Sequence, residues 1–297
     1  MRLRQIEVFH AVYTSGSMTN AAALLNVSQP SVSKVLAHAE QQLGYLLFDR
    51  VKGKLVATPE AHRLFAHVSA VYRDVDRLKH VAENLRAGNS GHIRIASTPA
   101  FGLDLLPRAI ASFREKHPDT IFEIETLHLD EMNEALLESR VDIGLAFAPP
   151  ATPGIEAETL ASSRFVALAP ASIDFGGKTS LTAADLRGHP FIGLNSRGPL
   201  GQILSTYLGP VEDDLNIVTW SETYHVAKAL VAYGSGVTIA DEITAKSAGH
   251  SGLQILPLQP ELRFSIKAMH LGAVPLSIAA QNFVKHLSAS LDDFLSA

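Results

Sequence analysis

The chain has 297 residues, 46% of them hydrophobic, which is enough for more than one domain with its own core. It contains no cysteine, so disulfide frameworks, thiolate zinc sites and cysteine nucleophiles are excluded, and no apolar run approaches the roughly 18 residues that cross a bilayer. Residues 1–88 carry 11 Lys and Arg against 7 Asp and Glu, a net charge of +4. Since the whole chain has 25 and 30, the remaining residues carry 14 against 23, a net charge of −9. A basic head therefore precedes an acidic body. No secretory leader pattern opens the sequence. We expect a cytoplasmic protein whose first part can approach nucleic acid.

Two short helices separated by a tight break are predicted near the N-terminus. Ser17 is a candidate N-cap for the first, and the run SMTNAAALL supplies small alanines where another helix must approach closely. After a break at 26–27, Ser28 is expected to cap a second helix, which has Pro30 in its first turn and ends near Gly44. This arrangement is typical of a helix-turn-helix.

The second helix has one apolar and one polar face. Its apolar positions recur every three or four residues and are expected to pack on the first helix and on an earlier amphipathic helix with Ile6, Phe9 and Tyr13. The opposite face carries small and hydrogen-bonding groups, which lets a helix backbone enter a major groove. The alternative is an ordinary solvated helix face. The candidate DNA contacts on this face are Gln29, Pro30, Ser31, Ser33 and Lys34.

The segment after this helix predicts a small hairpin. Two short apolar runs flank Lys52-Gly53-Lys54, and a glycine at the tip favours a turn with positive φ. Arg50, Lys52 and Lys54 would then form a basic wing that faces the sugar-phosphate backbone or the minor groove and adds salt-dependent affinity. The alternative is a turn that serves only solubility.

Residues 1 to about 60 resemble the winged helix-turn-helix of LysR-type transcriptional regulators. The resemblance rests on LRQIEVFHAV, on the block SMTNAAALLNVSQPSVSKVLAHAEQQLGYLLFDR and on Thr58-Pro59 after the hairpin, and the length of the chain fits the same family. It implies a DNA-binding transcriptional regulator. It also implies that one set of positions lies at or near the DNA surface, namely Gln29, Pro30, Ser33, Lys34 and Arg50.

A long helix is predicted next. Residues 59–87 contain no glycine and no proline after the first position, and apolar residues alternate steps of four and three from Leu64 to Leu85. We expect two copies to pair through this seam into a homodimer or homotetramer, whose heads would bind a partly palindromic operator. Packing of the stripe on the rest of its own chain is the alternative. The segment 88–91 is a predicted hinge.

Beyond residue 91, strands alternate with helices, which predicts a parallel α/β sheet in two lobes. The first lobe is expected to have strands at 93–97, 120–127 and 141–147 and helices at 103–116 and 130–139. The second is expected to have strands at 165–169, 191–194, 216–220 and 237–240 and helices at 183–187, 200–208 and 223–233.

The family resemblance implies that the strand at 264–271 and the helix at 276–295 return to the first lobe, as in a periplasmic-binding-protein-like effector domain. The predicted fold is therefore α/β with an all-α-type head. The expected boundaries are 1–58 for the winged head, 59–90 for the linker helix and hinge, and 91–297 for the effector domain, with lobe I at about 91–163 and 267–297 and lobe II at about 164–266.

Ligands of open α/β sheets bind beyond the carboxyl ends of strands, where helix N-termini present unpaired amides. Arg197 would hold a carboxylate through two parallel hydrogen bonds, and Glu222 would accept an amine. The alternatives are simple N-capping by Ser97 and Thr98 and a surface position for Arg197. The candidate effector contacts are Ser97, Thr98, Pro99, Ala100, Phe101, Phe147, Asn195, Ser196, Arg197 and Thr223.

The sequence does not favour catalysis or metal binding. The 13 histidines do not cluster at metal-ligand spacing, and Gly234-Ser235-Gly236 lacks the rest of a nucleophile elbow. We predict a regulator with no enzyme activity, metal or cofactor, whose C-terminal cleft binds a small carboxylate, amino acid or opine and alters promoter binding. The competing hypothesis is an α/β small-molecule-binding protein or enzyme that does not bind DNA and oligomerises through its N-terminal helices.

Overall fold

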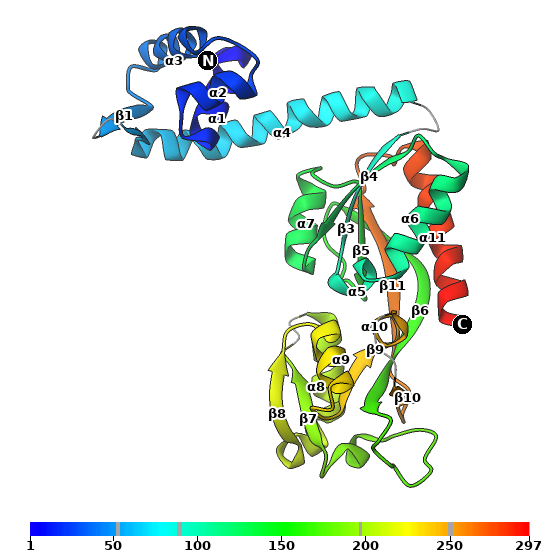
Figure 1. Cartoon of the computed structure of the whole chain (residues 1–297). Helices are drawn as coiled ribbons and strands as arrows, with labels where there is room; N and C mark the ends of the chain where they lie inside the picture. Colours follow the sequence, from blue (N-terminus) through cyan, green and yellow to red (C-terminus); the bar gives the residue numbers. More distant parts are fainter. Residues whose placement is uncertain (52–53, 88–90, 196–197, 249–251, 297) are drawn as a thin grey trace. The chain divides into compact units, whose positions relative to one another are not determined.

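A computed structural model describes the chain except for residues 52–53, 88–90, 196–197, 249–251 and 297 (Figure 1). Internal contacts divide the chain into two units, residues 1–82 and 83–297. Within the described part of the chain, no helix combines the length and the apolar composition that a membrane span requires.

The first unit is a three-helix head followed by a hairpin and a long helix (Figure 1). The Ser17 hydroxyl accepts hydrogen bonds from two backbone amides at the start of α2, and Gly44 ends α3 with a left-handed φ of 80°. Ser28 occupies the predicted N-cap position of α3, although its hydroxyl contacts that of Ser31 at 2.9 Å and forms no capping bond to a backbone amide. The elements are α1 (Leu3–Ser15), α2 (Met18–Leu24), α3 (Gln29–Leu43), β1 (Phe48–Val51), β2 (Lys54–Ala57) and α4 (Pro59–Ala87).

Aromatic stacking joins α4 to α1 at the base of the head. The rings of Tyr13 and Phe65 stack with centroids 3.7 Å apart, and those of His10 and Tyr72 stack at 4.2 Å. Val68 of α4 is buried in the same core as Phe9. About the first four turns of α4, from Pro59 to Tyr72, are therefore part of the head, and packing of these rings fixes the direction in which the helix leaves it.

The second unit contains a seven-stranded sheet in the order β10-β6-β11-β5-β3-β4, with β9 also paired to β6, and a separate pair β7-β8. In lobe I, α6 and α11 cover one face of the sheet and α7 covers the other. In lobe II, α9 packs on one side of β6, β7 and β9. The lobe I elements are β3 (His92–Ser97), α5 (Pro99–Gly102), α6 (Leu105–Lys116), β4 (Ile121–Thr126), α7 (Leu129–Leu137), β5 (Ile143–Phe147), β11 (Arg263–Leu271) and α11 (Ile278–Ser296). The others are β6 (Ile155–Pro170), η1 (Ala183–Leu186), β7 (Pro190–Leu194), α8 (Pro199–Leu208), η2 (Gly209–Asp214), β8 (Asn216–Ser221), α9 (Tyr224–Ala232), β9 (Thr238–Asp241), α10 (Glu242–Lys246) and β10 (Leu253–Pro257).

The sheet of lobe I is mixed, because an antiparallel strand joins the three parallel strands that the sequence predicts. Strands β3, β4 and β5 are parallel, but β11 runs antiparallel to both β5 and β6. The cause is the return of the chain from lobe II, which brings β11 back along the strand that leads out of lobe I. Strand β6 is also longer than the predicted 165–169, because its first part pairs with β11 and its last part with β9 and β10.

Candidate functional site

One face of α3 is open to solvent in the head. Val32, Leu36 and Ala39 are buried on the other face, as their spacing predicts. Asn26 adopts a left-handed φ of 51° before α3, which asparagine tolerates and which tightens the turn between the two helices. Of the predicted DNA contacts on α3, Ser33 is half-buried and the other four are exposed, namely Gln29, Pro30, Ser31 and Lys34.

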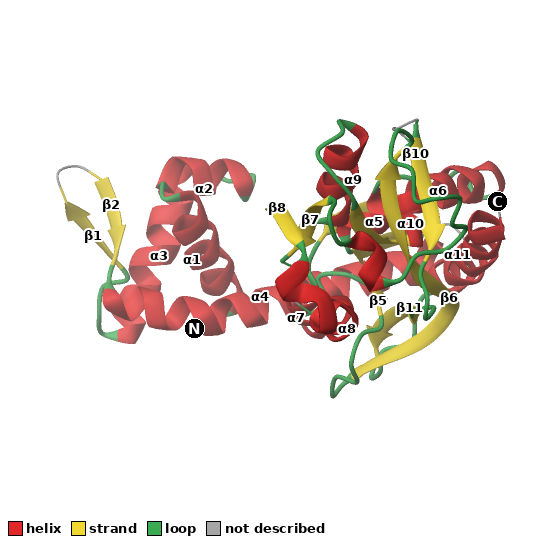
Figure 2. Ribbon diagram, turned by 90° about the horizontal axis from the view of Figure 1, so that it is seen from below, coloured by secondary structure: helices red, strands yellow, loops and turns green. Residues whose placement is uncertain are grey.

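The hairpin β1-β2 lies beside the three-helix head (Figure 2). Arg50 and Lys54 are both exposed on it, while the third predicted wing residue, Lys52, lies outside the described residues. The Glu40 carboxylate of α3 accepts hydrogen bonds from the backbone amides of Leu47 and Phe48 at 2.8 and 3.2 Å. A single side chain of α3 thus positions the start of the hairpin β1-β2.

Buried polar side chains complete this arrangement. Gln5 of α1 is only 4% exposed and donates to the side-chain oxygen of Gln42 on α3 at 2.9 Å. The Thr58 hydroxyl donates to the Leu46 carbonyl at 2.9 Å and accepts from the Ala61 amide at 3.1 Å, so it joins the base of the hairpin to the start of α4. Helix α3, hairpin and α4 therefore form one hydrogen-bonded assembly.

The apolar seam of α4 divides into two parts. Its first part, including Leu64 and Val68, packs in the core of the head, which is the alternative considered for the stripe. Further along, Val71 is 41% exposed and Leu78 is 69% exposed. A leucine so exposed in a heptad pattern is typical of a helix that pairs with another copy.

A cleft of about 410 Å³ lies between the two lobes of the second unit. It has the size of a small-molecule site. The first turns of α7, α8 and α9 contribute to its lining, together with the loop that follows β3. Six of the predicted effector contacts line it, namely Thr98, Pro99, Ala100, Phe147, Asn195 and Thr223.

The other four predicted effector contacts are not among the described residues that line the cleft. Ser97 and Phe101 are fully buried and are not among the residues that line the cleft. The Phe101 ring packs against Phe147 with centroids 4.4 Å apart, so it supports the cleft wall from behind. Ser196 and Arg197 lie outside the described residues.

The wall of the cleft contains polar groups that form no hydrogen bond with described residues. The side-chain hydroxyls of Thr98 and Thr244 are buried and have no hydrogen-bond partner among the described residues. Thr98 occupies the N-cap position of α5 but makes no side-chain capping bond, so the N-capping alternative does not describe its hydroxyl. Because a buried hydroxyl without a partner costs about 1–3 kcal/mol, these groups favour a polar ligand in the cleft.

Asp130 and Glu222 line the cleft with exposed carboxylates, and no lysine or arginine is among its described lining residues. The lining also includes His128, Leu129 and Glu131 at the start of α7. This segment follows the carboxyl end of β4, so the strand-end rule that predicts the other loops applies to it as well, and it is a part of the site that was not predicted.

Buried charges hold α10 behind the cleft. Lys228 donates from Nζ to the Thr244 carbonyl at 3.0 Å and to the Ser247 hydroxyl at 3.1 Å, and burial lowers the pKa of this lysine. Asp241 caps α10 by accepting from the Thr244 amide at 2.8 Å, and burial raises its pKa to about 6. The Asp104 carboxylate of lobe I accepts from the Ala248 amide at 3.0 Å. Lobe I thus reaches the segment that positions Thr244.

Comparison with known proteins shows that both parts of the chain match domains of one protein family. The profile of the bacterial regulatory helix-turn-helix protein, lysR family, matches residues 3–62, and that of the LysR substrate binding domain matches residues 86–292. The chain is 43% identical over 288 residues to the HTH-type transcriptional regulator DgcR of a Pseudoalteromonas species, which covers 97% of this chain and 99% of the relative. The chain belongs to the LysR family of transcriptional regulators.

Two further LysR-family proteins are similar to this chain over nearly its full length. Transcriptional activator protein LysR of Escherichia coli K12 is 31% identical over 297 residues, covering 100% of this chain and 96% of the relative. The crystal structure of full-length CbnR complexed with its target DNA is similar at a TM-score of 0.69 and 22% identity, covering 98% of this chain and all of that one. This protein is thus a LysR-type DNA-binding transcriptional regulator with an effector-binding domain, in the fold predicted from its sequence.

Glu40 provides a test of how this LysR-family head holds its wing. Glu40→Ala leaves the amides of Leu47 and Phe48 without their acceptor, at a cost of about 1–3 kcal/mol. We expect faster amide hydrogen exchange at these two residues and weaker DNA binding. Glu7→Ala is the matched control, because Arg4 is the one partner of the Glu7 carboxylate among the described residues and loss of this partly exposed pair should cost about 0–1 kcal/mol. Unchanged exchange in Glu40→Ala would contradict the anchoring role.

Proposed function

We propose that this regulator contacts its operator through the exposed face of α3 and the wing. The contacts on α3 are Gln29, Pro30, Ser31, Ser33 and Lys34, which suit base edges and phosphates in a major groove. Arg50, Lys52 and Lys54 of the wing add electrostatic contacts to the sugar-phosphate backbone. The exposure of Lys34, Arg50 and Lys54 supports this assignment.

The same proposal includes a homodimer or homotetramer that pairs through residues 59–87 and binds a partly palindromic operator in the cytoplasm. The exposure of Val71 and Leu78 in the apolar seam supports pairing. We assign the winged head to 1–58, the linker and hinge to 59–90 and the effector domain to 91–297. We assign the protein no enzymatic role, because the chemistry of both sites is that of binding.

The effector is proposed to be a small zwitterion that carries an amine and a carboxylate, such as an amino acid or an opine. The unpartnered hydroxyls of Thr98 and Thr244 in a cleft of about 410 Å³ carry this proposal. The N-termini of α7, α8 and α9 favour a carboxylate, because helix dipoles present partial positive charge there. Asp130 and Glu222 favour an amine. Arg197 stays a candidate for the carboxylate, since Asn195 and Gly198 on either side of it line the cleft.

Regulation then requires a difference in effector affinity between two arrangements of the lobes. An effector that binds one arrangement more tightly shifts the population toward it, whereas equal affinity for both changes nothing. Because contacts come from both lobes, closure or rotation of the lobes changes the number of groups that reach the ligand. Such a change is proposed to alter how the paired heads bind the promoter.

Thr98→Val tests the cleft, because it replaces the hydroxyl with a methyl group of similar size. Amino acids and opines are screened against the full-length wild type by thermal shift, where a ligand at 100 times its dissociation constant stabilises by about 2.7 kcal/mol. We expect at least one zwitterion to raise the melting temperature. We expect its affinity to fall about tenfold in Thr98→Val, since a hydrogen bond contributes roughly 0.5–1.5 kcal/mol.

Thr206→Val is the matched control, because the Thr206 hydroxyl donates to the Gln202 carbonyl of its own helix α8 and Thr206 is not among the described residues that line the cleft. Its effector affinity should equal that of the wild type. If no zwitterion shifts the wild type, the proposed effector class is wrong. If one does and Thr98→Val binds it normally, the Thr98 hydroxyl does not contact the effector.

A further inference from the structure

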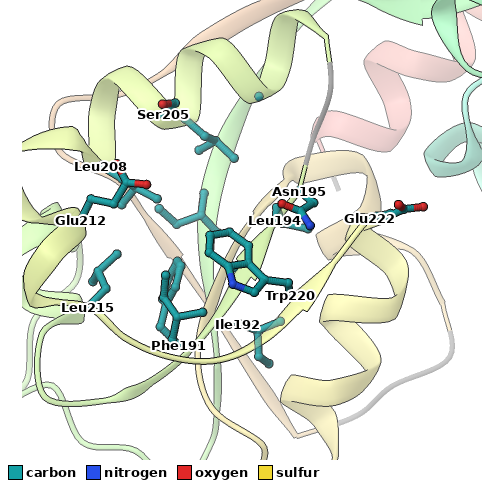
Figure 3. Close-up of a pocket in the computed structure, with 15 residues that line it drawn as sticks. Phe191, Ile192, Leu194, Asn195, Ser205, Leu208, Glu212, Leu215, Trp220 and Glu222 are labelled. Atoms are coloured by element: carbon teal, nitrogen blue, oxygen red, sulfur yellow. The ribbon is translucent and has the colours of Figure 1, made fainter.

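Lobe II contains a second cavity, of about 400 Å³, which adjoins the interlobe cleft and shares Asn195 and Glu222 with it (Figure 3). Strands β7 and β8 form one wall, and α8 with the turn at η2 forms the other. A space of this size lies within the range of small-molecule sites. Its wall combines apolar side chains, among them Phe191, Leu204 and Leu215, with polar groups.

Trp220 is the central feature of this cavity and the sole tryptophan of the chain. It lies opposite Gly193 in the register of β7 and β8, and a Cβ at Gly193 would come within 2.6 Å of two indole carbons. The glycine therefore lets the indole lie directly against the strand backbone. Trp220 nevertheless remains 53% exposed, so a large aromatic surface is available to a ligand.

The polar groups of the cavity carry negative charge. Glu212 and Glu222 contribute exposed carboxylates, and Figure 3 shows them on opposite sides of Trp220. Neither carboxylate forms a hydrogen bond or ion pair with another described residue, and no lysine or arginine is among the described residues that line the cavity. Anionic ligands are disfavoured here, whereas a cation gains from both the carboxylates and the indole face.

We propose that this cavity is a second ligand site, which takes a small organic cation with an apolar body, an alkylammonium ion. The alkyl chain packs on Trp220 and the leucines of α8, and the ammonium group pairs with Glu212. The site is distinct from the effector site proposed above, but Asn195 and Glu222 line both cavities. A bound alkylammonium ion therefore changes the surroundings of the interlobe cleft.

The test uses Trp220 fluorescence in the full-length protein, because no other tryptophan contributes to the signal. Hexylammonium, hexanol and hexanoate are titrated at constant ionic strength, so that the same alkyl chain carries a positive, a neutral and a negative group. We expect a saturable change with hexylammonium, about tenfold weaker binding of hexanol, and no saturation with hexanoate. Equal binding of all three compounds, or no saturable change with hexylammonium, would overturn the proposal.

Glu212→Gln shows where hexylammonium binds, because Glu212 lines the lobe II cavity and not the interlobe cleft. Asp213→Asn is its matched control, since it removes one carboxylate from the same turn without altering the cavity lining. We expect hexylammonium affinity to fall about tenfold in Glu212→Gln and to stay unchanged in Asp213→Asn. Equal affinity in the wild type and both variants would place hexylammonium elsewhere and overturn the site. Neither result depends on whether a zwitterion binds the cleft.

Discussion

Leu78→Asp should separate the paired copies of this regulator and lower its operator affinity by on the order of a hundredfold or more. Leu78 is 69% exposed in α4 and continues an apolar seam that includes the exposed Val71. Two facing carboxylates in a buried seam would each lose hydration and repel one another, which costs several kcal/mol. Without pairing, each head binds its half-site alone and the gain from simultaneous engagement is lost. Sedimentation velocity measures the assembly and fluorescence anisotropy measures operator binding.

Ala70→Asp is the control for added charge on the same helix. Ala70 is exposed and lies outside the apolar seam, so this variant should keep both assembly and operator affinity. A Leu78→Asp protein that assembles and binds DNA like the wild type would show that the exposed part of α4 does not pair. If both variants dissociated into single chains, the effect would come from added charge on α4 and not from loss of the apolar seam.

Lys34→Glu should reduce operator affinity by about a hundredfold at moderate salt. Lys34 is exposed on α3, and the substitution both removes a cation from the DNA face and brings a carboxylate toward the phosphates. Neutralising fewer phosphates releases fewer counterions, so the plot of log affinity against log salt should become shallower, by about one unit for each lost contact. Effector binding in the cleft should not change.

Lys285→Glu makes the same charge change on the exposed surface of α11. Because it alters the net charge of the protein equally, it separates a local contact from a general electrostatic effect. We expect nearly normal operator affinity and an unchanged salt slope. Equal losses in the two lysine variants would mean that Lys34 acts only through net charge.

The head was largely predictable because its signals are local. Ser17 and Gly44 mark helix ends through their own hydrogen bonding and φ preference, and α4 runs over 59–87, the segment free of internal breakers. Ser28 and Glu40 show where local reasoning stops. The Ser28 hydroxyl had a competing partner in Ser31, and the role of Glu40 depends on a hairpin that folds back onto α3.

The effector domain was less predictable where strands serve both lobes. Strand β6 crosses from one lobe to the other without a turn, so the sequence carries no boundary signal within 155–170. Helix α10 and strand β10 were missed because both are short, and each is held by tertiary contacts. The break between α5 and α6 falls at Asp104, whose carboxylate bonds the distant Ala248 amide.

The sequence by itself determined most of the helices and strands and the order of the two units. It also determined that the loops after β3, β5 and β7 are candidates for ligand binding. It could do so because caps, periodicity and helix breakers act over a few residues. Only the tertiary structure decided which side chains meet. It put Ser97 and Phe101 behind the cleft wall and brought Thr244 and the start of α7 into it. It also placed Gly193 against Trp220 and Glu212 near them in a second cavity. The physical reason is that burial, orphaned hydroxyls and cavities depend on contacts between residues far apart in the chain, and no local pattern encodes those distances.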